Sequence, residues 1–287
     1  MVDANGSRFH VVEAGTGPLV LLLHGFPEYW WTWRHQISPL ADAGYRVVAV
    51  DLRGYGASDK PPRGYDGYTL AGDVAALIRS LGERDAAVVG HDWGGHVAWT
   101  TAAFHPRMVR RLAVIGIPHP LRLRNALLSQ PAQVRASGYI AAFQTPRYEH
   151  RVTRDRAAYV GDLLRHWSGP AWTNTADFAA YEQACRTAMQ IPQAAFCAME
   201  YYRWSVRSLS RPSGWRFNQL LAAPISAPVL QLHGALDSCI LPSTAAGSGR
   251  YVSGRYEWLL LGGVGHFPQS EAAEAVTGEL VRWLKEG

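Results

Sequence analysis

Short, wholly apolar runs are the feature that most restricts the fold of this chain. The run from Leu19 to Leu23 is typical of a strand buried on both faces of a sheet, and such strands are usually parallel. Similar patterns recur at Arg46 to Val50, Ala86 to Val89, Leu112 to Ile117, Pro228 to Leu232 and Tyr256 to Leu261. Helix-length segments lie between several of them, at Leu70 to Leu81, Gly94 to Phe104 and Ser270 to Lys285. With an alternating strand from Arg8 to Glu13, this order predicts an α/β fold with a mostly parallel, doubly wound sheet.

The stretch from residue 118 to 223 departs from this rhythm. It has helical patterns and many Trp and Tyr residues, but no clear buried strand. Proline-containing segments stand near its two ends, at 118–120 and 222–224, and proline disfavours helix at the residue before it. We therefore predict a core domain of residues 1–117 and 224–287, with residues 118–223 inserted as a helical lid.

Composition and charge argue against several classes of protein. With 48% apolar and 18% charged residues, the chain has the composition of an ordered globular protein. The formal charge of +5 comes from scattered basic residues, so we expect no nucleic-acid partner. No stretch reaches the ~18 apolar residues of a membrane span, and the N-terminus lacks the pattern of a signal peptide. We expect no membrane insertion.

The cysteines give a further expectation. Cys185, Cys197 and Cys239 are odd in number and lack the spacing of a metal site. A reducing compartment fits this pattern best, so a cytoplasmic location without a bound metal is expected. The sequence leaves a homodimer open.

The segment with the strongest chemical signal is Val88 to Gly95, which reads Val-Val-Gly-His-Asp-Trp-Gly-Gly. An apolar strand here meets a helical pattern through a sharp turn, with Asp92 where serine hydrolases place their nucleophile. Such a turn strains the central residue, and Gly90 and Gly94 supply the small neighbours that it requires. The following helix would direct its N–H groups at the carboxylate and keep it ionised. The alternative for Asp92 is an ordinary helix cap.

A nucleophilic carboxylate needs a histidine that activates water and an acid that orients the histidine. In this arrangement the chain order is nucleophile, acid, histidine. Asp237 and His266 each follow a predicted strand, where open parallel sheets build their sites, and His266 is preceded by several glycines. No Asp or Glu occurs between Trp93 and Tyr148, which leaves Asp237 as the best acid.

The oxyanion of the reaction also needs hydrogen-bond donors. The segment His-Gly-Phe-Pro-Glu at 24–28 follows the first buried strand, at the place where one backbone N–H is supplied; the residue after the nucleophile supplies the other. This assigns the donors to Phe26 and Trp93, and we expect Phe26, Pro27 and Trp93 to contact substrate. Residues 51–58 look like a structural turn.

Over nearly its whole length the chain resembles the epoxide hydrolases of the α/β-hydrolase fold. The resemblance rests on residues 24–28, 51–58 and 90–95 and on the placements of Asp237 and His266. It implies a covalent ester on Asp92, no cofactor, an epoxide as the small-molecule partner and a vicinal diol as product. It also implies two lid tyrosines at the ring oxygen: Tyr139, four residues before a Phe-Gln pair, and Tyr202, before Arg203. Tyr201 is the alternative to Tyr202.

Two other functions compete with epoxide hydrolysis. Haloalkane dehalogenases share the Asp-Trp-Gly-Gly motif, but they usually have a polar or acidic residue at the place of Phe26. Fluoroacetate dehalogenases have Arg where this chain has Trp93. A non-catalytic ligand-binding member of the fold is the third hypothesis, against which stands a complete set of catalytic residue types.

Overall fold

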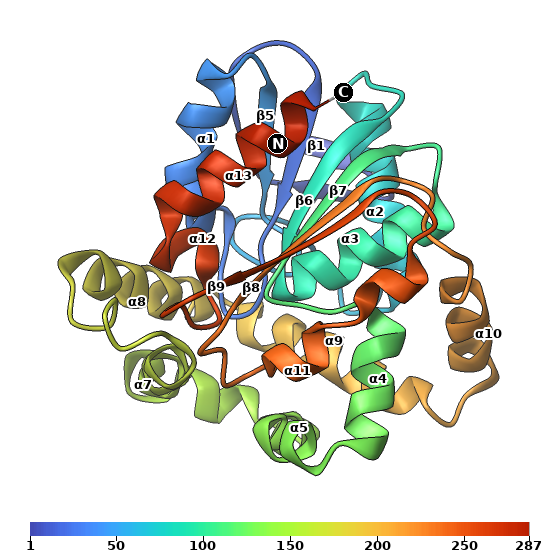
Figure 1. Ribbon diagram of the computed structural model, residues 1–287. Helices are drawn as coiled ribbons and strands as arrows, with labels where there is room; N and C mark the ends of the chain where they lie inside the picture. Colours follow the sequence, from blue (N-terminus) through green and yellow to red (C-terminus); the bar gives the residue numbers. More distant parts are fainter. Residues whose placement is uncertain (287) are drawn as a thin grey trace.

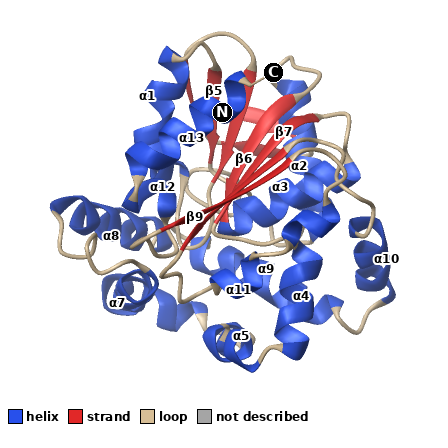
Figure 2. Ribbon diagram, viewed as in Figure 1, coloured by secondary structure: helices blue, strands red, loops and turns tan. Residues whose placement is uncertain are grey.

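The computed structural model describes residues 1–286, and a seven-stranded sheet forms its centre (Figures 1 and 2). The strands are β1 (Val2–Ala4), β2 (Ser7–Phe9), β3 (Val11–Ala14), β4 (Leu19–Leu23), β5 (Arg46–Val50), β6 (Ala86–His91), β7 (Val109–Ile115), β8 (Val229–Gly234) and β9 (Tyr256–Leu261). The main sheet has the order β3-β5-β4-β6-β7-β8-β9, and β1 and β2 form a separate pair. Only β3 is antiparallel to its neighbour, so the mostly parallel sheet is confirmed.

Helices alternate with the strands of the sheet. They are η1 (Trp30–Trp33), α1 (Arg34–Asp42), α2 (Gly67–Ser80), α3 (Asp92–Phe104), α4 (Pro120–Ser129), α5 (Pro131–Ala136), α6 (Gly138–Phe143), α7 (Glu149–Trp167), α8 (Ala176–Met189), α9 (Ala194–Ser208), α10 (Pro212–Leu221), α11 (Pro242–Ala245), η2 (Ser248–Tyr251), α12 (Pro268–Glu271) and α13 (Ala273–Lys285). Within residues 1–286, no helix combines the length and the apolar character needed to cross a membrane.

The run at 19–23 is wholly apolar because helices cover both faces of β4. Leu21 and Leu23 belong to the apolar cluster that includes α2 and α3, whereas Val20 and Leu22 pack in the cluster of α1 and α13. All five residues of β4 are fully buried. Alternate side chains along the strand thus enter different layers, and the sheet is doubly wound as predicted.

Two predicted elements are each divided in the structure. The strand predicted at Arg8 to Glu13 is split at His10, whose N–H donates to Ser58 Oγ (2.8 Å) while its carbonyl accepts from Asp51 N–H. The helix predicted from Ser270 is split at Ala272, which has a non-helical backbone. The polar contacts at His10 come from distant segments, so the local apolar pattern could not reveal that break.

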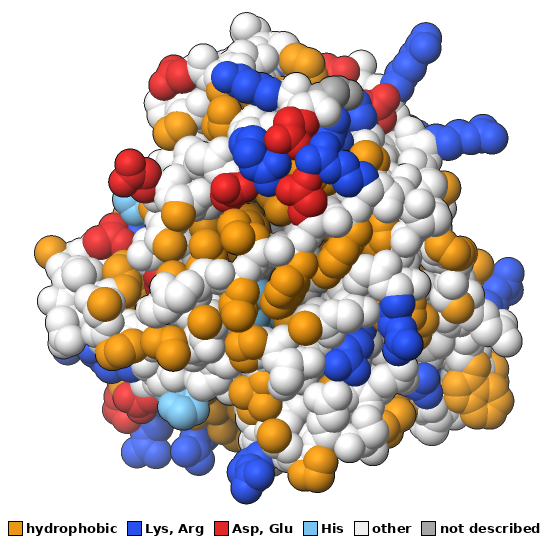
Figure 3. Space-filling view, viewed as in Figure 1, with side chains coloured by type: hydrophobic (Ala, Val, Ile, Leu, Met, Phe, Trp, Pro, Cys, Tyr) orange, Lys and Arg blue, Asp and Glu red, His pale blue; other side chains and the backbone are white. Residues whose placement is uncertain are grey.

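Helices α4 to α10 lie between β7 and β8 in the chain and gather at one end of the sheet (Figure 1). Their buried residues belong to the same apolar cluster as β4 and β6. Helix α7 is interrupted at residues 154–157. On the face in Figure 3, basic and acidic side chains intermix near α13, where Arg282 pairs with Glu257 and Glu286.

Candidate active site

Asp92 stands on a sharp turn between β6 and α3. Its φ of 46° lies in the left-handed region, which few residues other than glycine adopt. A side chain at Gly90 would bring Cβ within 2.4 Å of the Gly94 carbonyl oxygen, and one at Gly94 would come within 2.2 Å of Leu23 O. The two glycines are therefore required by close backbone packing, as the sequence predicted. Asp92 is 6% exposed, at the first position of α3.

The loop after β4 directs one backbone donor at this carboxylate. Phe26 N–H donates to Asp92 Oδ1 at 2.9 Å. The loop is held by His24, whose Nδ1 lies 2.8 Å from the Gly25 carbonyl and whose Nε2 accepts from Leu52 N–H. Trp93 N–H is among the first N–H groups of α3, which lack a partner within the helix. Phe26 and Trp93 thus flank Asp92 in the predicted arrangement.

Asp237 and His266 meet beside the same carboxylate. His266 Nδ1 lies 2.8 Å from Asp237 Oδ2, and His266 Nε2 lies 3.5 Å from Asp92 Oδ2. The other oxygen of Asp237 accepts from the N–H groups of Cys239 and Ile240, each at 2.8 Å. Asp237 is therefore fixed by backbone donors while its Oδ2 orients the imidazole. The three residues predicted from the sequence form one continuous array.

Charges within this array shift the protonation of its members. Burial alone would raise the pKa of Asp92, but the contact with His266, the charge of His91 and the Phe26 N–H lower it overall. Burial likewise opposes a charged His266, yet Asp237 and Asp92 raise the pKa of that imidazole well above 6.5. The resting site is therefore an Asp92 carboxylate beside an imidazolium.

Sequence reasoning overlooked two buried ionisable residues beside the site, Glu28 and His91. Both are fully buried, and His91 Nδ1 lies 2.7 Å from Glu28 Oε2. His91 Nε2 lies 2.7 Å from the carbonyl oxygen of His266, so both ring nitrogens face acceptors and both must donate. His91 thereby connects the turn at Asp92 to the backbone of His266.

Glu28 accepts from several elements at once. Its Oε2 takes the Gly25 N–H at 2.8 Å, and its Oε1 accepts from Gln269 Nε2 (2.9 Å) and from the Tyr181 hydroxyl of α8. Although burial raises the pKa of Glu28, His91 and the hydroxyl groups of Thr32 and Tyr181 lower it to about 2. The signal for this pair was in the sequence: each is an ionisable residue inside a motif next to a buried strand.

The two predicted lid tyrosines line the same cavity as Asp92. Tyr139 on α6 and Tyr202 on α9 line it, and their rings lie 5.8 Å apart. Burial, reinforced by the negative Asp92, raises the pKa of both phenols well above 10, so both keep a proton to donate. Tyr201 instead donates its hydroxyl hydrogen to Arg53 O at 2.7 Å, away from this cavity.

The cavity has a volume of about 160 Å³ and reaches from Asp92 to helices α4 and α10. Its wall is mainly apolar, as is usual for small-molecule sites. Among the described residues, Trp93 lines it, whereas Phe26 and Pro27 are buried beneath the wall. Within residues 1–286, no cluster of three His, Cys, Asp or Glu side chains is arranged for a metal ion.

Comparison with known proteins agrees with this geometry. Residues 18–273 match the family described as alpha/beta hydrolase fold. The chain is 33% identical over 296 residues to epoxide hydrolase 4 of Mus musculus, with 99% of this chain and 78% of that protein covered. It is 32% identical over 325 residues to epoxide hydrolase A of Mycobacterium tuberculosis, with 99% and 96% covered.

Solved structures give the same result. The crystal structure of a mutant epoxide hydrolase from Bacillus megaterium matches with a TM-score of 0.86 and 28% identity over 99% of each chain. Epoxide hydrolase A from Mycobacterium thermoresistibile matches with a TM-score of 0.84 and 29% identity, covering 99% of this chain and 97% of that one. Fold, site geometry and relatives lead to one assignment: the chain belongs to the epoxide hydrolases of the α/β hydrolase fold.

Proposed function

We propose that this enzyme converts an epoxide to a vicinal diol through a covalent ester on Asp92. The observation that carries the proposal is the placement of the Asp92 carboxylate between an imidazole and two protonated tyrosines that line one cavity. An opening epoxide becomes an alkoxide, which needs proton donors at its oxygen. A departing halide needs no such phenols, which favours epoxides over haloalkanes. Residues 118–223 act as the lid that supplies them.

In the first step Asp92 Oδ2 attacks an epoxide carbon and the carbon–oxygen bond breaks. Tyr139 and Tyr202 hydrogen-bond the ring oxygen, and one of them gives it a proton. Oδ1 stays at the Phe26 N–H and becomes the carbonyl oxygen of the ester.

In the second step water attacks Cγ of the ester. His266, oriented by Asp237, takes a proton from this water, and the N–H groups of Phe26 and Trp93 stabilise the oxyanion. Collapse of the tetrahedral intermediate releases the diol. Before water attacks, the imidazolium of the resting His266 gives its proton to the tyrosinate left by the first step, so His266 is neutral when it takes a proton from water. The two protons of the water end on the released hydroxyl and on His266, so the enzyme returns to its starting state.

The proposed function also has consequences for cofactors, cellular location and oligomeric state. We propose that neither step uses a cofactor, because carboxylate, imidazole and phenols of this chain carry every bond change. The three buried thiols are unpaired, which supports a cytoplasmic, reducing environment. A homodimer is compatible with the site, since all of the proposed groups come from one chain.

The order of oxygen transfer tests the covalent step. With enzyme in excess and a single turnover in ¹⁸O-water, the diol should be unlabelled, because its new oxygen comes from Asp92. Label should enter the peptide that contains Asp92 and reach the diol only in later turnovers. Labelled diol in the first turnover would refute the ester, and halide release without diol formation would favour a dehalogenase.

Trapping provides a second measurement. A His266→Gln variant should form the ester but hydrolyse it slowly, because no base activates water. Intact-mass spectrometry should then show the protein plus one epoxide, and an Asp92→Ala variant provides the control without adduct.

A further inference from the structure

The substrate cavity carries opposite charges at different places on its wall. Its lining includes one acidic residue, Asp92, and one basic residue, Arg124 of α4. His96 also lines it, but burial lowers the pKa of that imidazole to about 4, so it adds no charge near neutral pH. The reaction proposed above uses Asp92 and leaves Arg124 without a role.

Arg124 has unused hydrogen-bond donors. Its Nε is buried and has no hydrogen-bond partner, and within residues 1–286 its guanidinium forms no ion pair with an acidic side chain. By comparison Arg122, two residues earlier, donates through Nε to the carbonyl of Ala246 and through Nη2 to that of Ser243. A buried N–H without an acceptor is unfavourable by itself, so it indicates a place where an acceptor binds.

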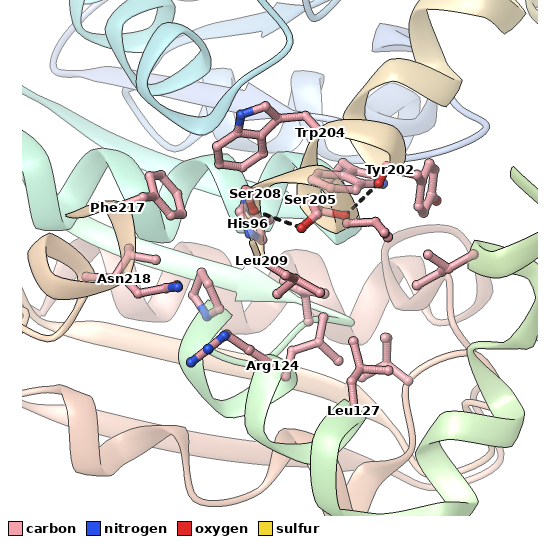
Figure 4. A pocket seen from close by; sticks show the side chains of 18 of the residues that line it. His96, Arg124, Leu127, Tyr202, Trp204, Ser205, Ser208, Leu209, Phe217 and Asn218 are labelled. Carbon is pink, nitrogen blue, oxygen red and sulfur yellow. Dashed lines mark hydrogen bonds between the residues drawn. The ribbon is translucent and has the colours of Figure 1, made fainter. Parts of the chain in front are cut away.

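A second donor lies near this guanidinium. Asn218 of α10 also lines the cavity, and in Figure 4 the side chains of Arg124 and Asn218 point into the same part of it, away from Tyr202. The rest of the wall includes many apolar side chains: Ile117, Leu123, Leu127, Ile140, Phe217 and Leu221. A ligand complementary to the whole cavity thus has an electrophilic end for Asp92 and an apolar middle. Its other end carries a hydrogen-bond acceptor for Arg124 and Asn218.

We propose that Arg124 and Asn218 form a distal subsite for a carboxylate carried by the substrate. A guanidinium binds a carboxylate through paired, charge-assisted hydrogen bonds, a geometry that the Arg side chain presents ready-made. The preferred substrates are then epoxides joined to a carboxylate by an apolar chain. This inference rests on the proposed function, and it adds the residues that select among epoxides.

A series of terminal epoxy acids tests the subsite, with the methyl ester of each acid as the uncharged counterpart. The acid-to-ester ratio of kcat/KM should peak at one chain length, because the distance between Asp92 and Arg124 is fixed. In Arg124→Met the acid-to-ester ratio of kcat/KM at the preferred chain length should fall by about 10-fold or more, as expected for a lost charge-assisted hydrogen bond. Asn218→Leu should lower it less, since it removes an uncharged donor.

Arg216→Met is the matched control. Arg216 is exposed on α10 and does not line the cavity, so its loss removes the same charge without touching the subsite. If both arginine variants lower the ratio equally, or if the ratio shows no preferred chain length, general attraction explains the preference and the subsite is refuted.

Direct binding separates this inference from the proposed reaction. Calorimetry with unreactive alkanoic acids and with alkanols of equal length needs no turnover. Tighter binding of the acids, lost in Arg124→Met and kept in Arg216→Met, supports the subsite even if no epoxide is opened. Equal binding of acids and alcohols overturns the subsite, while turnover of neutral epoxides would leave the hydrolase function standing.

Discussion

Asp92 must combine a strained backbone with a buried negative charge. Its left-handed φ would suit glycine, but only a carboxylate can form the ester. Conformations of this kind cost on the order of 1–3 kcal/mol and persist where the surroundings enforce them. Here Gly90, Gly94 and the Phe26 N–H do so, and the imidazole of His266 balances the charge.

The two neighbouring tyrosines of α9 should behave differently. Tyr202→Phe removes the proposed donor at the ring oxygen and should slow epoxide opening by about 10-fold to 100-fold, toward the low end of general acid catalysis. Tyr201→Phe loses the bond to Arg53 O, which should cost about 1 kcal/mol of stability while opening stays near normal. Stopped-flow rates and urea unfolding measure the two effects; the reverse pattern would exchange the assignments.

Glu28 should be central to stability. Glu28→Gln removes the buried partner of His91, and breaking such a pair typically costs about 3–5 kcal/mol in the free energy of unfolding. Because folding lowers the pKa of Glu28 from 4.5 to about 2, its stabilisation is complete above the unfolded value and is lost as pH falls through about 2.

The control for Glu28 is Glu13→Gln. Glu13 is 42% exposed in its pair with Arg46, and such a pair contributes about 0–1 kcal/mol. Urea unfolding at neutral and acid pH compares the two variants. If both variants lose a similar free energy of unfolding, Glu28 is not central to stability.

At the scale of elements, the β6–α3 unit sets the position of Asp92, the proposed nucleophile. The approach of α3 to β4 leaves no room for a side chain at Gly94, where a Cβ would meet two carbonyl oxygens at 2.2 and 2.5 Å. The turn is thus determined by contacts between three elements. Its glycines serve close approach, because neither Gly90 nor Gly94 has a positive φ.

Alanine substitutions test this view of the turn. Gly94→Ala should prevent the close approach of α3 to β4, giving a large loss of stability and of epoxide turnover. Gly278→Ala in α13 meets open space in a regular helix, so it should stabilise the protein by roughly 0.5–1 kcal/mol. Thermal unfolding of both variants provides the measurement, and a well-folded, active Gly94→Ala protein would contradict the account.

At the scale of the whole molecule, the parallel sheet brings the residues of the site together. Four different strands precede the residues of the site, which are Phe26, Asp92, Asp237 and His266. The carboxyl ends of these strands lie at one edge of the sheet. The helices between β7 and β8 then close this edge and add Tyr139 and Tyr202. One continuous apolar cluster joins both parts, so the tyrosines stand on a firmly packed support.

Protonation of the assembled site should change during turnover. The proposed esterification of Asp92 removes a negative charge beside His266, so the pKa of the imidazole should fall and free it to act as a base. NMR titration should therefore give a lower His266 pKa in Asp92→Asn than in the unchanged protein. Equal values would show that Asp237 alone sets the protonation of His266.

The same shift has a consequence for stability, because the folded-state pKa of His266 lies above its unfolded value. Its contribution is complete below about 6.5 and is lost as pH rises through the folded-state pKa. The free energy of unfolding should accordingly decline at alkaline pH, and less so in His266→Gln.

The sequence by itself determined the sheet class, the turn at Asp92 and the partners Asp237 and His266. These follow from local rules, since apolar runs, flanking glycines and strand ends are visible within a few residues. Only the tertiary structure placed Glu28 and His91 together, separated Tyr202 from Tyr201, and divided the predicted strand at His10. Each depends on contacts between distant segments, and the direction of a side chain on a helix is settled by what packs against it.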